Sequence, residues 1–147
     1  MGVEVKLVFH TEKVIKSIED AAGQRMAEAV MAVHKTVVEE TLVGSRTGRT
    51  YYVPGTKRTY TASAPGEPPA QATGRLRQSI GTSVKSEGKT VIGKVGSDLP
   101  YAARLEFGFR DTDSLGRRYN MAPRPWLRPS FEKSLGKIKS ILGSKWF

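Results

Sequence analysis

Side chains that could carry out chemistry are few and widely separated in this chain. His10 and His34 are its two histidines, and it has no cysteine. Neither histidine has a second ligand at the spacing that a helix would require, so we expect no zinc or iron site. The sequence also lacks a G-x-S-x-G elbow, a Walker loop and a Rossmann glycine pattern. It therefore predicts no bound metal and no other cofactor.

Four carboxylates lie loosely clustered in the second half of the chain, at Asp98, Glu106, Asp111 and Asp113. A paired-carboxylate hydrolase or a magnesium nuclease would need two or three of them held together. We expect Asp111 and Asp113 to lie in a solvated turn, because Gly and Arg flank them. We expect Glu106 to form an ion pair, either with the nearby Arg104 or with a neighbouring subunit. The sequence therefore argues against an enzyme.

The length of the chain, 147 residues, suits one domain. We predict a single domain over residues 1–147. No window reaches the roughly 18 apolar residues of a membrane span, so we expect no membrane partner. The lack of cysteine is compatible with a reducing cytosol.

A net charge of +10 is the strongest feature of the composition, with 24 Lys and Arg against 14 Asp and Glu. A field of this sign attracts polyanions and acidic protein surfaces. Between residues 44 and 78, Glu67 is the one acidic residue. The basic residues of the same region are Arg46, Arg49, Lys57, Arg58, Arg75 and Arg77.

The N-terminal part of the sequence predicts a strand and a long helix. Residues 3–9 alternate and then become apolar, which favours a short strand. Thr11 is suited to cap a helix over about residues 11–42, and Gly44 is suited to end it. Gly23 inside this helix predicts a bend or a close helix crossing. Apolar residues at spacings of three and four form one stripe along it, namely Val14, Ile18, Ala22, Met26, Ala29, Val33 and Val37.

Residues 45–72 predict a long loop rich in Gly, Ser, Thr, Pro and Arg, with Tyr51, Tyr52 and Tyr60 interleaved. We expect residues 45–71 to be flexible, because they have no apolar stripe. Basic and aromatic side chains together could stack on single-stranded nucleic acid. They also suit an arm that becomes ordered against a protein partner, because interfaces favour Tyr and Arg. The sequence has no recognised nucleic-acid-binding module, which favours the protein partner.

The middle of the chain predicts a short helix followed by a β-hairpin. Thr73 is suited to cap a helix that ends at Ile80. Residues 80–84 and 90–95 then alternate on either side of a Glu-Gly turn, which is typical of two antiparallel strands.

The C-terminal part predicts two further helices separated by a polar loop. The first helix follows Pro100 and ends at Gly108, and the loop over residues 109–121 is basic at Arg110, Arg117 and Arg118. Pro129 lies in the first turn of the last helix, where its missing N–H does no harm. The apolar stripe of that helix is Phe131, Leu135, Ile138 and Leu142, and its solvent-facing lysines are Lys133, Lys137, Lys139 and Lys145. These elements predict an α+β fold, in which a long N-terminal helix and a C-terminal helix pack on a small antiparallel sheet, with long basic loops.

Two patches of the sequence, taken in order, carry a resemblance to a known family. They are SAPGEPP and TGRLRQSI at 63–69 and 73–80, and VGS, YAARLEFG and PRPWLRP at 95–97, 101–108 and 123–129. In this order and spacing they resemble the tail-component family of lambda-like tailed bacteriophages, whose members are tail-completion or head–tail joining proteins at the neck. The resemblance covers about residues 62–131, and the N-terminal helix by position only. The long loop at 109–122 departs from the family, which usually has a Thr or a short insertion there.

The resemblance implies a small α+β subunit that acts by ring assembly, six-fold to match the tail tube, without enzymatic activity. Its implied partners are copies of itself, the neck proteins and the tail-tube or tail-terminator proteins, with DNA passing through the channel. Its implied location is the neck or tail of the virion, assembled in the host cytoplasm. No catalytic residue is carried over. The candidate interaction residues are Arg46, Arg49, Lys57, Arg58, Arg75, Arg77, Arg104, Glu106, Arg117 and Arg118.

A stand-alone basic nucleic-acid-binding protein is the alternative function. It explains the charge of the chain but leaves the second patch unexplained. A small nuclease or another enzyme is a third class, for which the sequence offers no set of catalytic residues.

Overall fold

The computed structural model describes residues 1–8 and 16–144, and it has the predicted α+β fold. A three-stranded antiparallel sheet has the strand order β1-β5-β4, formed by β1 (Gly2–Val8), β5 (Thr90–Gly96) and β4 (Gly81–Glu87). The predicted first strand and the predicted hairpin are both confirmed. The two hairpin strands are joined at Gly88 and Lys89, and Gly88 has a φ of 58°, which glycine adopts without strain.

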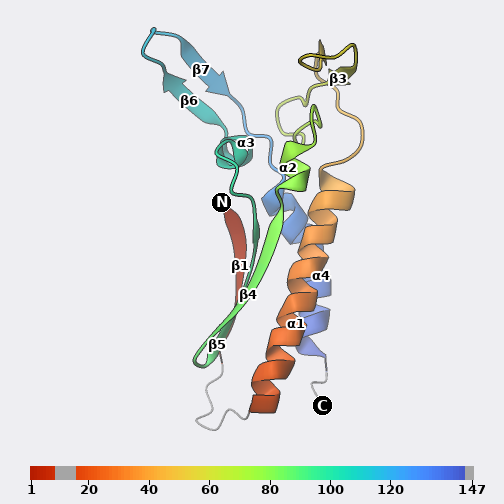
Figure 1. Ribbon diagram of the computed structural model, residues 1–147, viewed down its shortest axis with the longest axis vertical. Helices are drawn as coiled ribbons and strands as arrows, with labels where there is room; N and C mark the ends of the chain where they lie inside the picture. The colour runs from red at the N-terminus through yellow and green to blue at the C-terminus, as the bar shows by residue number, and fades with distance from the viewer. Residues whose placement is uncertain (9–15, 145–147) are drawn as a thin grey trace.

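Two helices cover one face of this sheet and lie side by side (Figure 1). They are α1 (Lys16–Lys35), which continues into the π-helical turn η1 (Thr36–Thr41), and α4 (Leu127–Gly143). Helix α1 lies so close to the sheet that a Cβ atom at Gly93 would be 2.5 Å from Met26 Sδ and Val30 Cγ1. The core between the layers includes Ala22, Met26, Val30, Val33, Val37, Val91, Val95, Trp126, Leu127 and Ile138.

The stripe predicted along the first helix is confirmed from Ala22 to Val37, whereas the close helix crossing predicted at Gly23 is wrong and the alternative of a bend there stays a prediction. No heavy atom outside the local backbone lies within 4 Å of a Cβ atom built at Gly23, so no other element crosses closely there. The helix becomes irregular at its C-terminal end, in η1, and Gly44 follows with a φ of 92°. The expected cap at Thr11, as well as His10 and Val14, lies outside the described residues.

The C-terminal helix is confirmed, but its buried line differs from the predicted stripe. Ser130 and Ser134 are buried, together with Leu127 and Ile138, whereas Leu135 is half-buried. Ser134 Oγ donates to Thr36 Oγ1 at 2.9 Å, and Ser130 Oγ lies 2.6 Å from Thr41 Oγ1. Small hydroxyl side chains, which the predicted apolar stripe does not include, therefore pair where α4 meets η1.

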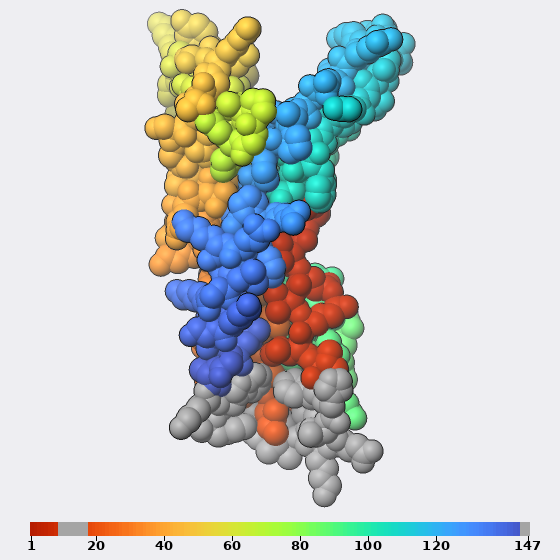
Figure 2. All heavy atoms as spheres, turned by 180° about the vertical axis from the view of Figure 1, so that it is seen from behind, coloured from red at the N-terminus to blue at the C-terminus, as the bar shows by residue number. Residues whose placement is uncertain are grey.

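Both segments predicted as loops contain β-hairpins, and each hairpin projects from the body (Figure 1). Strands β2 (Thr50–Tyr52) and β3 (Thr59–Thr61) form one, which we call the β2–β3 arm. Strands β6 (Phe109–Thr112) and β7 (Arg118–Met121) form the other, the β6–β7 arm. Figure 2 shows the two arms diverging at one end of the elongated molecule. The flexibility expected of residues 45–71 stays a prediction.

Two short helices lie where the arms meet the body. They are α2 (Arg75–Gln78) and α3 (Ala102–Phe107). The predicted cap at Thr73 is wrong, because Gly74 precedes α2 with a φ of 76° and no side chain caps the helix. The predicted end of α3 at Gly108 is confirmed, and its φ of 80° explains why a glycine stands there.

Candidate functional site

The two sequence patches that carry the family resemblance lie against each other in the fold. The N–H of Gly66 donates to the carbonyl oxygen of Pro123 at 3.0 Å, which joins a segment of the first patch to one of the second. Ser79 Oγ, at the end of α2, lies 2.6 Å from Ser97 Oγ, beyond the end of β5. We call the meeting point of residues 63–66, 102–106 and 122–128 the junction. Both arms begin next to it.

Glu106 is the central residue of the junction, and its role differs from the expected ion pair. The side chain is 5% exposed. Its Oε2 accepts the N–H groups of Trp126 and Leu127 at 2.7 and 2.9 Å, and its Oε1 accepts that of Arg128 at 2.9 Å. These N–H groups belong to the start of α4, where backbone donors have no partner within the helix. The carboxylate therefore caps α4 and also suits the positive end of the helix dipole.

Trp126 fixes α3 against the start of α4. Its side chain is fully buried, and its indole Nε1 donates to the carbonyl oxygen of Ala102 at 3.2 Å. A buried indole N–H usually needs such an acceptor, and here it is supplied by the first residue of α3. The side chain of Glu106, on α3, thus binds the start of α4, and the side chain of Trp126, at the start of α4, binds α3.

Arg124 connects the junction to the segment that follows the β2–β3 arm. Its guanidinium donates to Ser63 Oγ at 3.2 Å, to the carbonyl oxygen of Ser63 at 3.4 Å and to that of Ala122 at 2.6 Å. Its own N–H donates to the carbonyl oxygen of Leu105 at 2.7 Å. One residue therefore fixes the exits of both arms, because Ala122 follows β7 and Ser63 follows β3.

Arg46 holds the base of the β2–β3 arm. Its Nε donates to the carbonyl oxygen of Pro68 at 2.7 Å, and its terminal nitrogens donate to those of Thr41 at 2.9 Å and Val43 at 3.1 Å. Further bonds reach the carbonyl oxygens of Ser45 and Pro69. A guanidinium with all of these acceptors in its own chain serves structure, so Arg46 is not available as a free interaction residue.

Glu67 closes the same loop on its outer side. Its carboxylate accepts Thr47 Oγ1 at 2.5 Å, the N–H of Thr47 at 3.1 Å and the N–H of Ala64 at 2.9 Å. The hydrogen bond from the Thr47 hydroxyl is the main cause that lowers the pKa of Glu67, followed by the N–H groups of Ala64 and Thr47. The one acidic residue of this basic region thus folds the loop on itself.

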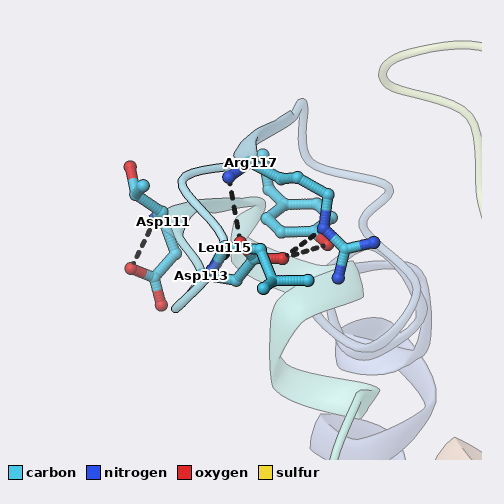
Figure 3. Close-up of polar contacts among 6 residues, drawn as sticks. Asp111, Asp113, Leu115 and Arg117 are labelled. Carbon is cyan, nitrogen blue, oxygen red and sulfur yellow. Dashed lines mark hydrogen bonds and ion pairs between the residues drawn. The ribbon is translucent and has the colours of Figure 1, made fainter.

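Asp113 organises the turn of the β6–β7 arm (Figure 3). Its Oδ1 accepts the N–H groups of Leu115 and Arg117, both at 2.9 Å. Its Oδ2 accepts Arg117 Nε at 2.6 Å and the Tyr119 hydroxyl at 3.0 Å. The backbone hydrogen bond from Arg117 is the largest cause that lowers the pKa of Asp113. The turn is therefore tied to one carboxylate, and it holds out the side chain of Leu115, which is 76% exposed.

Two more of the predicted interaction residues have partners within the chain. The guanidinium of Arg104 lies over the ring of Phe109, 4.2 Å from its centroid, which anchors the first residue of β6 to α3. Arg77 Nε donates to the carbonyl oxygen of Val38 at 2.8 Å and so connects α2 to η1. Arg104 and Arg77 remain exposed, so each combines a structural contact with a solvent-facing charge.

The remaining predicted residues present charge to solvent. Within the described part of the chain, no side-chain hydrogen bond, ion pair or ring contact is found for them, and all are exposed. They are Arg49, Lys57, Arg58, Arg75 and Arg118. Three of them lie on or next to the β2–β3 arm, one opens α2 and one opens β7. The structure thus divides the ten candidates into residues whose side chains make contacts within the chain and residues whose charges face solvent.

A cavity of about 420 Å³ lies between the two arms. Its walls come from β3, from the segment that leads into α2, from α3 and from the end of β7. The lining includes the apolar or aromatic side chains of Leu42, Tyr60, Leu76, Tyr101, Leu105 and Met121, and the guanidinium groups of Arg75, Arg77 and Arg124. A second hollow of about 670 Å³ lies beside the β6–β7 arm and shares Tyr101, Leu105 and Met121 with the first.

The sequence did not reveal Arg124 or this cavity, and it predicted the turn at Asp113 but not the hydrogen bonds by which Asp113 holds that turn. Arg124 lies within a quoted motif, but nothing in a Pro-Arg-Pro segment tells which distant carbonyl oxygens the arginine will reach. A signal for Asp113 was present, because Asp followed by Ser and Gly is typical of a turn that the carboxylate stabilises. The signal for Glu106 lay elsewhere: Trp126 occupies the N-cap of α4 and has no capping side chain, so an acceptor must come from another element.

The described residues contain no group of three or more His, Cys, Asp or Glu that could hold a metal ion. Within residues 1–8 and 16–144, none of the helices has both the length and the apolar character that crossing a membrane requires. Comparison with known proteins finds no match to any protein-family model, to any curated protein or to any solved structure.

Proposed function

We propose that this chain is a structural subunit that completes a phage tail or joins the head to the tail, by assembling into a ring. One observation carries the proposal. The segments that resemble the phage tail-component family meet in the fold as the junction, and the junction holds two arms away from the body. The hydrogen bonds of the junction fix the direction of two projecting arms, and such arms are suited to assembly with neighbouring proteins.

The arms support a function in assembly because a two-stranded hairpin is marginally stable by itself in water. Every residue of β2 is exposed, and so are most residues of β6 and β7. Tyr52 and Leu115 are 73% and 76% exposed, and each projects from an arm. Packing against another protein would bury these side chains, and interfaces are enriched in aromatic residues and arginine.

The exposed cations indicate the charge of the partners. Among the described residues, no ion pair is found for Arg49, Lys57, Arg58, Arg75 or Arg118, so they suit acidic faces on adjoining subunits or on neck and tail proteins. Guanidinium groups pair with carboxylates through two parallel hydrogen bonds, which fixes orientation as well as attraction. The proposed assembly is a homo-oligomeric ring of six copies in the neck or tail of the virion, formed in the host cytoplasm, with DNA passing through its channel.

A stand-alone nucleic-acid-binding protein remains the second candidate function. The observation that favours it is the combination of exposed Tyr51 and Tyr52 with Arg49 and Arg58 on one arm. Such a surface would bind single strands by stacking and by phosphate contacts. Its affinity would fall steeply with salt, with a slope of about −0.7 per phosphate contacted on single strands and about −0.9 on duplex.

Complementation separates the two functions. Particles made without this protein are expected to accumulate as filled heads and separate tails, and adding the purified protein is expected to join them. A variant in which an Asn-Gly turn replaces residues 112–118 keeps the pairing of Asp111 with Tyr119 and the junction, and loses the tip of the β6–β7 arm, so it should fold and fail to join. Lys137→Glu, on the exposed side of α4, is the control that should join normally.

The mass of the purified protein, alone and with tail-tube protein, gives the number of subunits in the ring. Particles that lack the protein but carry normally joined tails, and that fail to package or replicate DNA, would refute the joining function. The nucleic-acid-binding function would then replace it.

A further inference from the structure

We propose that the cavity between the arms is the binding site for a short acidic segment of a partner protein, with one apolar side chain of that segment inserted into it. The proposal deepens the proposed function by naming the chemistry that such a partner must present.

The walls of the cavity suit an apolar side chain. Tyr60, Leu105 and Met121 are half-buried and line the space from three different elements, namely β3, α3 and β7. A hollow of about 420 Å³ falls within the range of small ligand sites, which are mostly apolar with a few polar groups that fix orientation. An aliphatic or aromatic side chain placed here would leave water and contact both arms at once.

The charges at the edge determine the sign of the partner. Arg75, Arg77 and Arg124 line the cavity, and none of the described residues that line it is acidic. Arg77 and Arg124 are oriented by carbonyl oxygens at 2.8 Å or less, whereas Arg75 has no partner within the described residues. Carboxylates that flank the inserted apolar residue would supply the missing counter-charges, and guanidinium groups favour carboxylate partners in a fixed geometry.

The cavity favours a peptide over a nucleic acid. Nucleic-acid strands are bound by grooves in which rows of cations follow the backbone and aromatic faces stack on successive bases. Here three cations, Arg75, Arg77 and Arg124, line a hollow with apolar walls. The exposed pair Tyr51 and Tyr52, which would suit stacking, is not part of its lining. One apolar side chain between acidic residues fits the arrangement better than a run of phosphates.

The cavity is formed before any partner binds. Gln71 Nε2 donates to the carbonyl oxygen of Leu42 at 2.7 Å, and Arg46 binds the carbonyl oxygens of Pro68 and Pro69, so the wall at 68–71 is held against η1. Arg124 fixes the opposite wall through Ser63. A preorganised site loses less entropy on binding than one that must first become ordered.

The test selects from a random peptide library displayed on yeast, with the purified wild-type protein as bait. Peptides enriched on the wild type are expected to place Asp or Glu on both sides of a Leu, Phe or Trp. The best peptide is then synthesised with a fluorophore and titrated by anisotropy. Ala70→Trp fills the cavity without a change of charge and is expected to abolish binding, because Ala70 is part of its lining.

Charge reversal gives a second variant that does not depend on filling the cavity. Arg75→Glu is expected to weaken binding about tenfold or more. The substitution removes one guanidinium–carboxylate pair and places a negative charge next to the acidic peptide. Arg118→Glu changes the net charge equally but lies on the β6–β7 arm outside the cavity lining, and it should change the affinity less than about twofold. Melting curves of all three variants confirm that they fold.

Equal weakening by Arg75→Glu and Arg118→Glu overturns the proposal, because it indicates attraction by net charge alone. Enrichment of peptides without acidic residues overturns it as well, as does an oligothymidylate that binds more tightly than the best peptide and competes with it. The proposed function fails separately. A protein that binds the peptide but does not join heads to tails refutes the joining function only, and one that joins them without binding any acidic peptide refutes this site only.

Discussion

Replacing Glu106 by glutamine tests whether the junction is what holds the arms and α4 in place. Glu106→Gln keeps the shape of the side chain but leaves one acceptor oxygen where the carboxylate had two. The amide oxygen can occupy the position of Oε2 and accept Trp126 and Leu127. The amide NH₂ group then faces the N–H of Arg128, donor against donor.

The expected cost follows from these contacts. A part-buried N–H without a partner costs about 1–3 kcal/mol, and two charge-assisted hydrogen bonds that become neutral lose roughly half of their strength. We therefore expect Glu106→Gln to lower the free energy of unfolding by about 2–4 kcal/mol. For a chain of this size the same change corresponds to a fall in Tm of roughly 5–15 °C.

Urea unfolding followed by circular dichroism measures the change, with the slope of the transition as a check that both states are comparable. Glu132→Gln is the matched control. It makes the same substitution on α4, at a side chain that is 58% exposed and accepts Arg128 Nε at 3.1 Å, and it should cost no more than about 0.5 kcal/mol. Equal unfolding midpoints for Glu106→Gln and Glu132→Gln would refute the capping role.

Three further predictions concern the arms and the C-terminal helix. The pKa of Asp113 is lowered in the folded protein, so its hydrogen bonds stabilise the β6–β7 turn fully at a pH above the unfolded-state pKa of about 4. This stabilisation is lost as the pH falls through the folded-state pKa. The amide NMR signals of Leu115 and Arg117 should shift over that pH range in the wild type and should not shift in Asp113→Asn. Ile138→Asp should destabilise the fold by several kcal/mol and Leu135→Asp by less, because Ile138 is 4% exposed and Leu135 is half-buried, whereas Lys137→Asp should melt like wild type. Limited trypsin digestion should cut first at Lys57 or Arg58 in the β2–β3 turn and spare Arg46, which is held by its carbonyl partners; a first cut within α4 would contradict this.

The body of the fold was predictable because its signals are local. Apolar residues from Ala22 to Val37 recur at helical spacing, and Gly88 marks the turn between two alternating strands. Such patterns arise because one face of each element must leave water, and they can be recognised without knowing what covers that face. The buried serines of α4 escaped prediction because nothing in their local sequence indicates what covers them. Their burial depends on Thr36 and Thr41, which are distant in sequence and hydroxyl-bearing like them.

The arms escaped prediction because they bury little. Strands β2 and β3 have three residues each, and β6 and β7 have four, so none is long enough to show an alternating pattern. The whole segment 45–72, which contains β2 and β3, is rich in Gly, Ser, Thr, Pro and Arg, and this composition is typical of a loop. What makes them hairpins is the backbone pairing and, in the β6–β7 arm, the turn held by Asp113. Side chains that face solvent on both sides of a strand leave no periodic signal.

The motifs that carry the family resemblance acquire a physical meaning from the junction. Glu106, Trp126 and Arg124 contact backbone groups of this same chain, so substitutions there should first change the direction of the arms and the stability of α4. Exposed side chains that could touch a partner, such as Tyr52 and Leu115, lie outside the quoted motifs. If the chain acts by assembly, the motifs therefore specify how the arms are held, whereas the arms and the cavity between them specify what they bind. The β6–β7 arm occupies most of residues 109–122, and a change there would disturb the body of the fold least.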